Sequence, residues 1–227
     1  MDGAAAPSSA AASASAHMLL REHTRDAHDA AEATAGMRAL MSGGMDEAGY
    51  RELLAAQRRL YEAWETERAS EIAAITATWP YTSRLPHLTA DLSVGAALVA
   101  MGACDNAEDP VVPREKMSRA SALLHVGAAP RASGFPQGDT AFWGELYVIE
   151  GSTLGGQVIV RHLRERFPAL PHAFYAMGEH APGRWRRFQR VLDDVLADEA
   201  SQRLAIAGAQ HMFARFQQTL QDPGHHV

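Results

Sequence analysis

The chain has 227 residues, a length that suits one large domain or two small ones with a sizeable core. Hydrophobic residues make up 47% and charged residues 21%, which is ordinary for a globular protein and excludes a fully disordered or fibrous chain. The formal net charge of -6 provides no overall basic field, so no nucleic-acid partner is expected. The single cysteine, Cys104, excludes an internal disulfide and any metal site built from several cysteines.

The two ends of the chain are predicted to be tails. Residues 1–16 consist mainly of Ala and Ser and lack the basic start and apolar run of a secretory signal, so we expect a disordered segment. The folded domain is expected over residues 17–221, and residues 222–227 follow it as a short C-terminal tail. No apolar stretch approaches the roughly 20 residues needed to cross a bilayer, so we expect a cytoplasmic protein with no membrane partner.

Apolar residues recur at helical spacing along the chain, and no alternating strand pattern is found. We therefore predict an all-α fold in a single domain. The first helix is predicted over residues 18–34, with Gly36 as its C-terminal stop. Asp46 is the predicted N-cap of a long second helix that ends, at the latest, before Pro80.

The second half of the chain is predicted to be equally helical. Residues 127–138 contain three glycines and two prolines and are expected to form a loop. The remaining predicted helices cover residues 86–101, residues 113–125 with a weaker pattern, and residues 140–167, 182–196 and 199–220.

Three glycines interrupt the helix predicted over residues 140–167: Gly151, Gly155 and Gly156. Each glycine inside a helix costs about 1 kcal/mol relative to alanine, so the group needs a reason. Gly151 and Gly155 are four residues apart and share one helix face, where they leave a strip of bare backbone. The strip indicates either the close approach of a flat ligand or close helix–helix packing, and the pattern alone supports both.

His28 lies on the inward face of the first predicted helix, and Glu32 follows one turn later. At this spacing the Glu32 carboxylate can accept a hydrogen bond from one imidazole nitrogen while the other nitrogen faces a ligand. A histidine followed by a glutamate is also common in helices that bind nothing. The pair therefore predicts a metal ligand with a supporting carboxylate or, as the ordinary alternative, a structural histidine.

The predicted helix over residues 182–196 begins with a basic run at residues 183–190. Arg186 and Arg190 share one helix face, so their guanidinium groups can clamp a pair of carboxylates at the rim of a pocket. Trp185 and Phe188 are expected to point toward the core. The usual meaning of such a run is a solvated basic face, and that alternative stays open.

Two segments resemble the heme oxygenase family. Residues 20–32 resemble its opening helix, with Leu, Thr, His and Glu at every fourth position. Residues 146–158 contain Glu-Gly-Ser-Thr-Leu-Gly-Gly-Gln and resemble its glycine-rich distal helix, in the form most similar to the bacterial branch that makes biliverdin for bacteriophytochromes. The resemblance extends over most of the chain and implies a heme oxygenase-like helical bundle, with heme between the first helix and the glycine-rich helix.

The resemblance implies roles for individual residues on both sides of the heme. His28 becomes the axial ligand of the iron, the one metal ligand predicted, and Glu32 becomes its hydrogen-bond partner. Gly151 and Gly155 face the opposite side of the ring. The residues implied in holding the two heme propionates are Arg21, Arg186 and Arg190.

Ser152 is the main departure from the family pattern, because many members carry at this position an aspartate that orders water. The resemblance therefore leaves oxygen activation to Ser152, Thr153, backbone groups and bound water. A hydroxyl can hold such water because it both donates and accepts hydrogen bonds. The alternative for Ser152 is a helix-interior serine bonded to a carbonyl group one turn back.

The resemblance implies a heme oxygenase that opens heme to biliverdin and releases carbon monoxide and ferrous iron. Heme is then both cofactor and substrate, and dioxygen is the second substrate. Because the sequence has no flavin or nicotinamide motif, we expect an external reductase or ferredoxin-type donor, and a bacteriophytochrome as acceptor of biliverdin. The alternatives are a heme-binding or heme-carrying protein without ring cleavage and a similar enzyme acting on another small ligand. A di-iron protein is not expected, because no Glu-x-x-His motif occurs.

Overall fold

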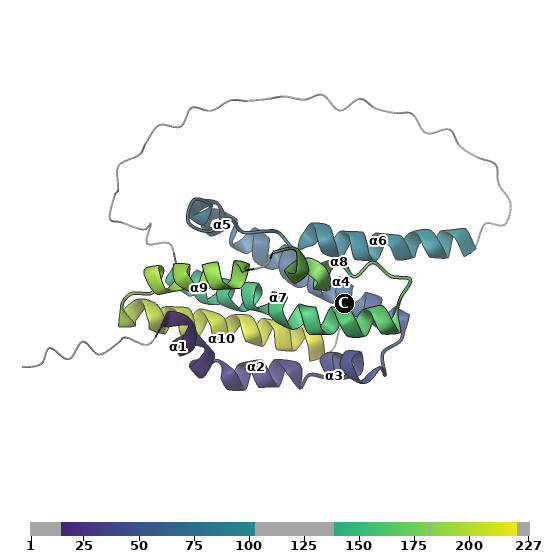
Figure 1. Ribbon diagram of the computed structural model, residues 1–227, viewed down its shortest axis with the longest axis horizontal. Coiled ribbons are helices and arrows are strands. Elements are labelled where there is room, and N and C mark those ends of the chain that lie inside the picture. The colour runs from purple at the N-terminus through teal and green to yellow at the C-terminus, as the bar shows by residue number, and fades with distance from the viewer. Residues whose placement is uncertain (1–14, 103–138, 182, 222–227) are drawn as a thin grey trace, which may run out of the picture.

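The computed structural model describes residues 15–102, 139–181 and 183–221. Within these ranges the chain is all-α and contains no strand. Its elements are α1 (Ala16–His23), α2 (Arg25–Glu32), α3 (Ala35–Ser42), α4 (Glu47–Glu67), α5 (Ala69–Ile75), α6 (Leu85–Gly102), α7 (Thr140–Arg166), α8 (Ala173–Ala176), the 3-10 helix η1 (Met177–His180), α9 (Arg184–Val195) and α10 (Glu199–Gln221). Figure 1 shows α7 and α10 side by side in the centre, with α1, α2 and α3 along one edge and α5 and α6 along the other.

The first predicted helix is broken in the structure. α1 ends before Thr24 and α2 begins after it, and the Thr24 side chain is buried at the break. Its hydroxyl donates to the Leu20 carbonyl oxygen at 2.7 Å, a type of contact that bends helices. The Gln210 amide of α10 donates to the His23 carbonyl oxygen at 3.2 Å. The break therefore lies where α10 contacts the chain, and one uninterrupted helix over residues 18–34 is wrong.

Gly36 does not end the first helix, because it lies inside α3. A Cβ atom at Gly36 would lie 2.4 Å from the carbonyl oxygen of Leu220, so the missing side chain lets α3 approach the end of α10. The residue that ends α3 is Gly43, which adopts a left-handed conformation with φ 74°. Glycine reaches that conformation without the steric cost that other residues meet.

The predicted N-cap of the long helix is confirmed. The Asp46 carboxylate accepts a hydrogen bond from the Gly49 backbone nitrogen at 2.8 Å. The helix ends at Glu67, well before the limit at Pro80, and Arg68 separates α4 from α5. The Arg68 guanidinium pairs with the buried carboxylate of Glu145 on α7 at 2.6 Å, which ties this junction to the centre of the molecule.

The later helices agree with the sequence predictions to within about two residues, the usual uncertainty of helix ends. α3, α8 and η1 were not predicted. The predicted helix over residues 113–125 and the loop over residues 127–138 lie outside the described residues, as do residues 1–14 and the C-terminal tail. Ala16, which was assigned to the N-terminal tail, is buried as the first residue of α1. None of the described helices is long and apolar enough to cross a membrane.

The core is built on close contact between α7 and α10. A Cβ atom at Gly144 of α7 would lie 1.7 Å from the Ala205 carbonyl oxygen, and one at Gly208 of α10 would lie 2.0 Å from the Ala141 carbonyl oxygen. The two backbones touch at these points because both glycines lack side chains. Large apolar residues fill the core around this contact, among them Tyr61, Trp64, Phe142, Leu146, Ile149, Phe188 and Met212.

We predict that Gly208→Ala lowers the free energy of unfolding by about 3 kcal/mol, because the added methyl group must displace the Ala141 backbone. Gly44→Ala is the control, since its nearest neighbour would be the Ser42 hydroxyl at an ordinary 3.5 Å, and we expect a change below about 0.5 kcal/mol. Urea unfolding followed by circular dichroism measures both variants. Equal stabilities would contradict the close contact of α7 with α10.

Candidate functional site

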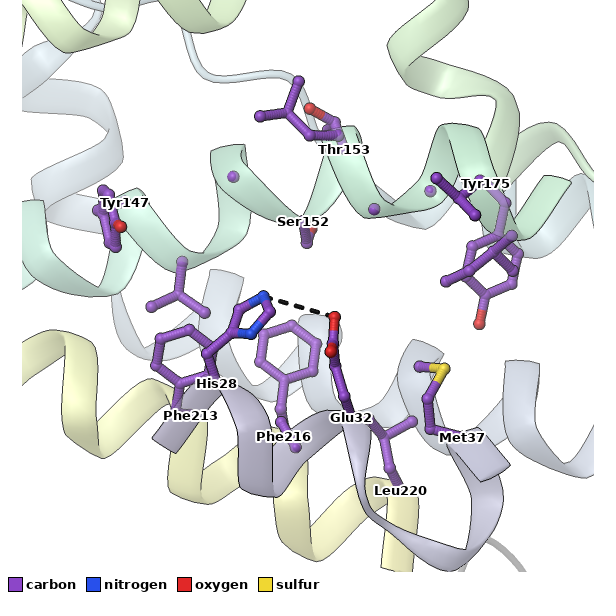
Figure 2. A pocket seen from close by; sticks show the side chains of 18 of the residues that line it. His28, Glu32, Met37, Tyr147, Ser152, Thr153, Tyr175, Phe213, Phe216 and Leu220 are labelled. Atoms are coloured by element: carbon purple, nitrogen blue, oxygen red, sulfur yellow. Dashed lines mark ion pairs between the residues drawn. The ribbon is translucent and has the colours of Figure 1, made fainter. Parts of the chain in front are cut away.

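A cavity of about 1030 Å³ lies between α2 and α7, with α10 along one side (Figure 2). Most of its walls are apolar, which suits a flat organic ligand held mainly by burial of apolar surface. The apolar side chains that line it include Met37, Val148, Ile159, Phe213, Phe216 and Leu220.

The side chains of His28 and Glu32 project from α2 into this cavity (Figure 2). The His28 ring packs edge-on against Phe213, with 5.9 Å between ring centroids, and 55% of the His28 side chain is exposed. Its Nε2 atom lies 3.7 Å from Glu32 Oε1, and its Nδ1 atom lies 3.6 Å from Asp29 Oδ1. Both distances are too long for hydrogen bonds. The carboxylate beside Nδ1 is therefore that of Asp29, whereas Glu32 lies beside Nε2.

The three glycines of α7 have different surroundings. A Cβ atom at Gly155 would have no atom within 4 Å, so its bare backbone faces the open space of the cavity. At Gly151 a Cβ atom would lie 3.5 Å from the Trp185 ring. Gly156 is a packing glycine, because a Cβ atom there would lie 2.9 Å from the Tyr175 carbonyl oxygen. Close packing therefore explains Gly156, whereas the backbone at Gly155 leaves open space in the cavity.

Ser152 points into the cavity, and Thr153 points away from it on the other side of α7 (Figure 2). The Ser152 hydroxyl donates to the Ile149 carbonyl oxygen at 2.8 Å, and the Thr153 hydroxyl donates to the Glu150 carbonyl oxygen at 2.7 Å. Ser152 thus has the bond to its own helix that the sequence left open as an alternative. Its proton is engaged, while its oxygen can still accept a hydrogen bond.

Tyr61 and Arg84 are polar residues of the cavity that the sequence analysis did not single out. Tyr61 of α4 is fully buried, and its hydroxyl has no hydrogen-bond partner of good geometry within the described residues. Burial raises the pKa of Tyr61, while the charge of Arg84 and the hydroxyl of Ser152 partly oppose that rise. The Arg84 guanidinium is also buried and donates to the Ile149 carbonyl oxygen at 3.2 Å. In the sequence, Tyr61 has the spacing of an ordinary core residue of the long helix. No local sequence pattern distinguishes Arg84 as a cavity residue.

Glu150 joins the cavity wall to the neighbouring elements through a buried charge network. Arg184 of α9 donates two hydrogen bonds to its carboxylate, each at 2.8 Å, and the Trp79 indole donates a third at 3.2 Å. Burial raises the pKa of Glu150, but the hydrogen bond from Arg184 and the charges of Arg84 and Arg184 outweigh it, so the pKa lies below its usual value. The ionised carboxylate therefore holds α9 against α7 beside the glycine strip.

The structure does not bring the predicted pair of propionate-binding arginines on α9 to the cavity. Arg186 and Arg190 are exposed and do not line it. Phe188 is fully buried and sets the rotation of α9, so that Trp185 and Gln189 line the cavity instead. The helical turn of about 100° per residue then turns the two arginines off this face.

Arg21 does line the cavity, as the sequence predicted. It is exposed at the mouth, where Arg25 of α2 and His17 of α1 lie on the same lining surface. Arg38 of α3 is a further basic residue of the lining. The exposed positive charge at the cavity therefore comes from the first three helices, the buried charge comes from Arg84, and the exposed arginines of α9 contribute none.

The sequence model of the heme oxygenase family matches residues 14–127 and 133–222. The chain belongs to the heme oxygenase family. A curated heme oxygenase from Xanthomonas campestris pv. campestris (strain 8004) is 37% identical over 183 residues, which are 79% of this chain and 93% of that protein. The structure of a heme oxygenase from Leptospira interrogans matches 92% of this chain and 100% of its own chain, with a TM-score of 0.62 and 18% identity. The resemblance and the all-α heme oxygenase-like fold are thereby confirmed.

Heme oxygenases bind heme as substrate and prosthetic group, and the residues of the cavity fit such a group. His28 offers an imidazole, a common heme ligand, on one wall. On the other wall, a side chain at Gly155 would project into the space that the ring needs. Arg21 and Arg25 at the mouth can pair with two carboxylates, and the wall formed by α10 is apolar.

We predict that His28→Ala removes the imidazole-bound absorption spectrum of the hemin-loaded protein and lowers turnover about tenfold or more, because the iron loses its protein ligand. Added imidazole is expected to restore part of the spectrum. The matched control is His23→Ala, since His23 is exposed at the end of α1 and does not line the cavity. An unchanged iron–histidine stretching band in the resonance Raman spectrum would exclude His28 as the ligand.

Proposed function

We propose that this protein cleaves heme oxidatively to biliverdin and releases carbon monoxide and ferrous iron. The observation that carries the proposal is the cavity between α2 and α7, into which the His28 side chain projects from α2 and which the bare backbone of Gly155 lines on α7. The relative from Xanthomonas campestris, which is named a heme oxygenase, supports the same activity. A role restricted to carrying heme is not favoured, because a carrier does not need an open position opposite its axial ligand.

Bound heme supplies an iron centre that activates dioxygen, and the protein contributes binding and geometry. His28 would hold the iron from the side of α2. The glycine backbone at Gly151 and Gly155 would leave space on the side of α7, bounded at Gly151 by the Trp185 ring. Phe213 and Phe216 exclude water from the apolar side of the cavity.

The reaction consumes protons, and Tyr61 is placed to hold one. Its buried hydroxyl has a raised pKa, so it stays protonated and can donate a hydrogen bond to a water molecule beside Ser152. The oxygen of Ser152 can accept a hydrogen bond from the same water, although its own proton is engaged by Ile149. We therefore assign to Tyr61 and Ser152 together the water-holding role that the sequence assigned to Ser152 and Thr153.

The partners follow from the same proposal. An external reductase or ferredoxin-type protein supplies electrons in the cytoplasm, and a bacteriophytochrome accepts the biliverdin. Arg21 and Arg25 take the place of the predicted arginine pair on α9 in holding the heme propionates, since both line the cavity mouth.

The test is to mix the purified protein with hemin and to follow the absorption spectrum under a reductant and oxygen. Loss of the heme bands, growth of a biliverdin band and release of carbon monoxide and iron in equal amounts are expected. A protein that binds hemin tightly but leaves it intact under these conditions would support the carrier role. Catalase is added to remove free hydrogen peroxide, because peroxide in solution can degrade heme without the enzyme.

We predict that Tyr61→Phe lowers the yield of biliverdin per electron consumed by roughly tenfold, because a hydrogen-bond donor to the cavity water is lost while hemin binding is kept. Ser152→Ala is expected to have a smaller effect, since its proton already bonds Ile149. Tyr81→Phe is the matched control, because its hydroxyl bonds Glu65 at 2.9 Å and does not line the cavity. Wild-type yield and rate in Tyr61→Phe would remove Tyr61 from the reaction.

A further inference from the structure

Asp91 of α6 is a buried carboxylate that the site described above does not use. Only 4% of the residue is exposed, and it does not line the cavity. Its Oδ1 atom accepts a hydrogen bond from the backbone nitrogen of Ala173 at 2.6 Å, and its Oδ2 atom accepts one from that of Phe174 at 2.9 Å. These are the first two N–H groups of α8, which have no partner within the helix itself. Asp91 therefore ties α6 to the first turn of α8.

The turn that leads into α8 is held by hydrogen bonds from two sides. His172, the residue before α8, is buried and has φ 54°, in the left-handed region that is sterically costly for a residue with a side chain. Its Nε2 atom donates to the Phe167 carbonyl oxygen at 2.9 Å, so its Nδ1 atom accepts from the Tyr50 hydroxyl of α4 at 3.0 Å. A helix of four residues is too short to form alone. The position of α8 therefore depends on Asp91 and on the His172 turn.

α8 forms one end of the cavity. Phe174 and Tyr175 line it, and Figure 2 shows Tyr175 at the opposite end of the cavity from Tyr147. The Tyr175 hydroxyl accepts a hydrogen bond from the Gln57 amide of α4 at 2.7 Å. The two aromatic residues of α8 therefore close this end of the cavity at a place that Asp91 sets from outside.

Phe174 also contacts Tyr61, the residue to which we assign a hydrogen bond to water in the cavity. The Tyr61 ring packs edge-on between two aromatic rings, with centroid distances of 5.7 Å to Phe174 on α8 and 6.0 Å to Phe216 on α10. Rings packed on two sides restrict how the Tyr61 ring can tilt. The direction of the Tyr61 hydroxyl therefore depends on where α8 holds Phe174.

We propose that Asp91 is a positioning residue for heme cleavage: by fixing the first turn of α8, its carboxylate sets the place of Phe174 and, through that ring, the direction of the Tyr61 hydroxyl. The proposal rests on the proposed function and adds to it a residue outside the cavity. The alternative is that Asp91 only stabilises the fold. The two roles differ in one respect, because a residue that acts through Tyr61 has no further effect on the reaction once the Tyr61 hydroxyl is removed.

The first experiment uses the protein without heme and follows it by NMR. Asp91→Asn keeps the size of the side chain, but an amide has one acceptor oxygen where the two N–H groups of α8 need two. We expect the backbone N–H groups of Ala173 and Phe174 to exchange with solvent about tenfold faster in this variant. We also expect the ring carbon resonances of Tyr61 to shift, because the contact with Phe174 changes.

Two further variants serve as a control and as a second probe. Asp198→Asn makes the same substitution at the start of α10, where Asp198 accepts from the Ser201 backbone nitrogen at 2.9 Å and does not line the cavity. We expect it to leave the exchange in α8 and the Tyr61 resonances unchanged. Tyr50→Phe removes the hydrogen bond to His172, so we expect both changes at a smaller size, with exchange about threefold faster. This variant tests the link even where Asp91→Asn does not fold.

The second experiment is a double-mutant cycle on the yield of biliverdin per electron consumed. We expect Asp91→Asn to lower the yield about fivefold on its own and by less than about 1.5-fold when combined with Tyr61→Phe. Hemin affinity is expected to change by less than about twofold, because His28 and Arg21 are untouched. An equal drop in both backgrounds would leave Asp91 with a role in stability alone and overturn the proposal. Unchanged exchange in α8 together with unchanged Tyr61 resonances would also overturn it.

A failure of the positioning role can be told apart from a failure of the proposed function. A wild type that turns heme into biliverdin, while α8 and Tyr61 do not respond to Asp91→Asn, keeps the proposed function and loses the positioning role. A wild type that leaves heme intact, while both NMR signals respond in the protein without heme, loses the proposed function and keeps the link from Asp91 to Tyr61.

Discussion

The position of α7 depends on backbone contacts that glycines allow on different faces of the helix. Gly144 brings α7 against Ala205 of α10, and Gly156 brings it against Tyr175 of α8. Contacts between backbones leave no side chain that can rotate away, so α7 cannot shift without moving both neighbours. The cavity wall that carries Gly155 and Ser152 is therefore fixed in position. Packing outside the site thus sets the width of the cavity between α7 and α2.

The buried carboxylate of Glu150 extends this constraint to α9. An unpaired charge at this depth would cost several kcal/mol, and its pairing with Arg184 requires α9 to lie directly against α7. The same contact places Trp185 beside Gly151 and directs the remaining arginines of α9 to the outside. One ion pair thus couples three features: the rotation of α9, the shape of the cavity next to the glycine strip, and the basic outer surface.

The polar groups of the cavity show how a departure from a family pattern is accommodated. Ser152, at the position where the resemblance implies an aspartate in many family members, bonds its own helix. The buried polar atoms opposite it come from other elements, Tyr61 from α4 and Arg84 from the turn before α6, and they approach α7 at and near Ile149 and Ser152. Much of the buried polarity beside α7 is therefore supplied across contacts with neighbouring elements.

The sequence by itself determined the features that depend on residues close in the chain. Helical spacing predicted α4, α6, α7, α9 and α10, and one side chain was enough to predict the Asp46 cap. The four-residue spacing of His28 with Glu32, and of Gly151 with Gly155, predicted residues that line the cavity. Only the tertiary structure decided the break at Thr24, the packing role of Gly36, the turning of Arg186 and Arg190 to solvent, and the presence of Tyr61 in the cavity. Each of these depends on a neighbouring helix, because packing between distant segments selects which face of a helix is buried and where it bends.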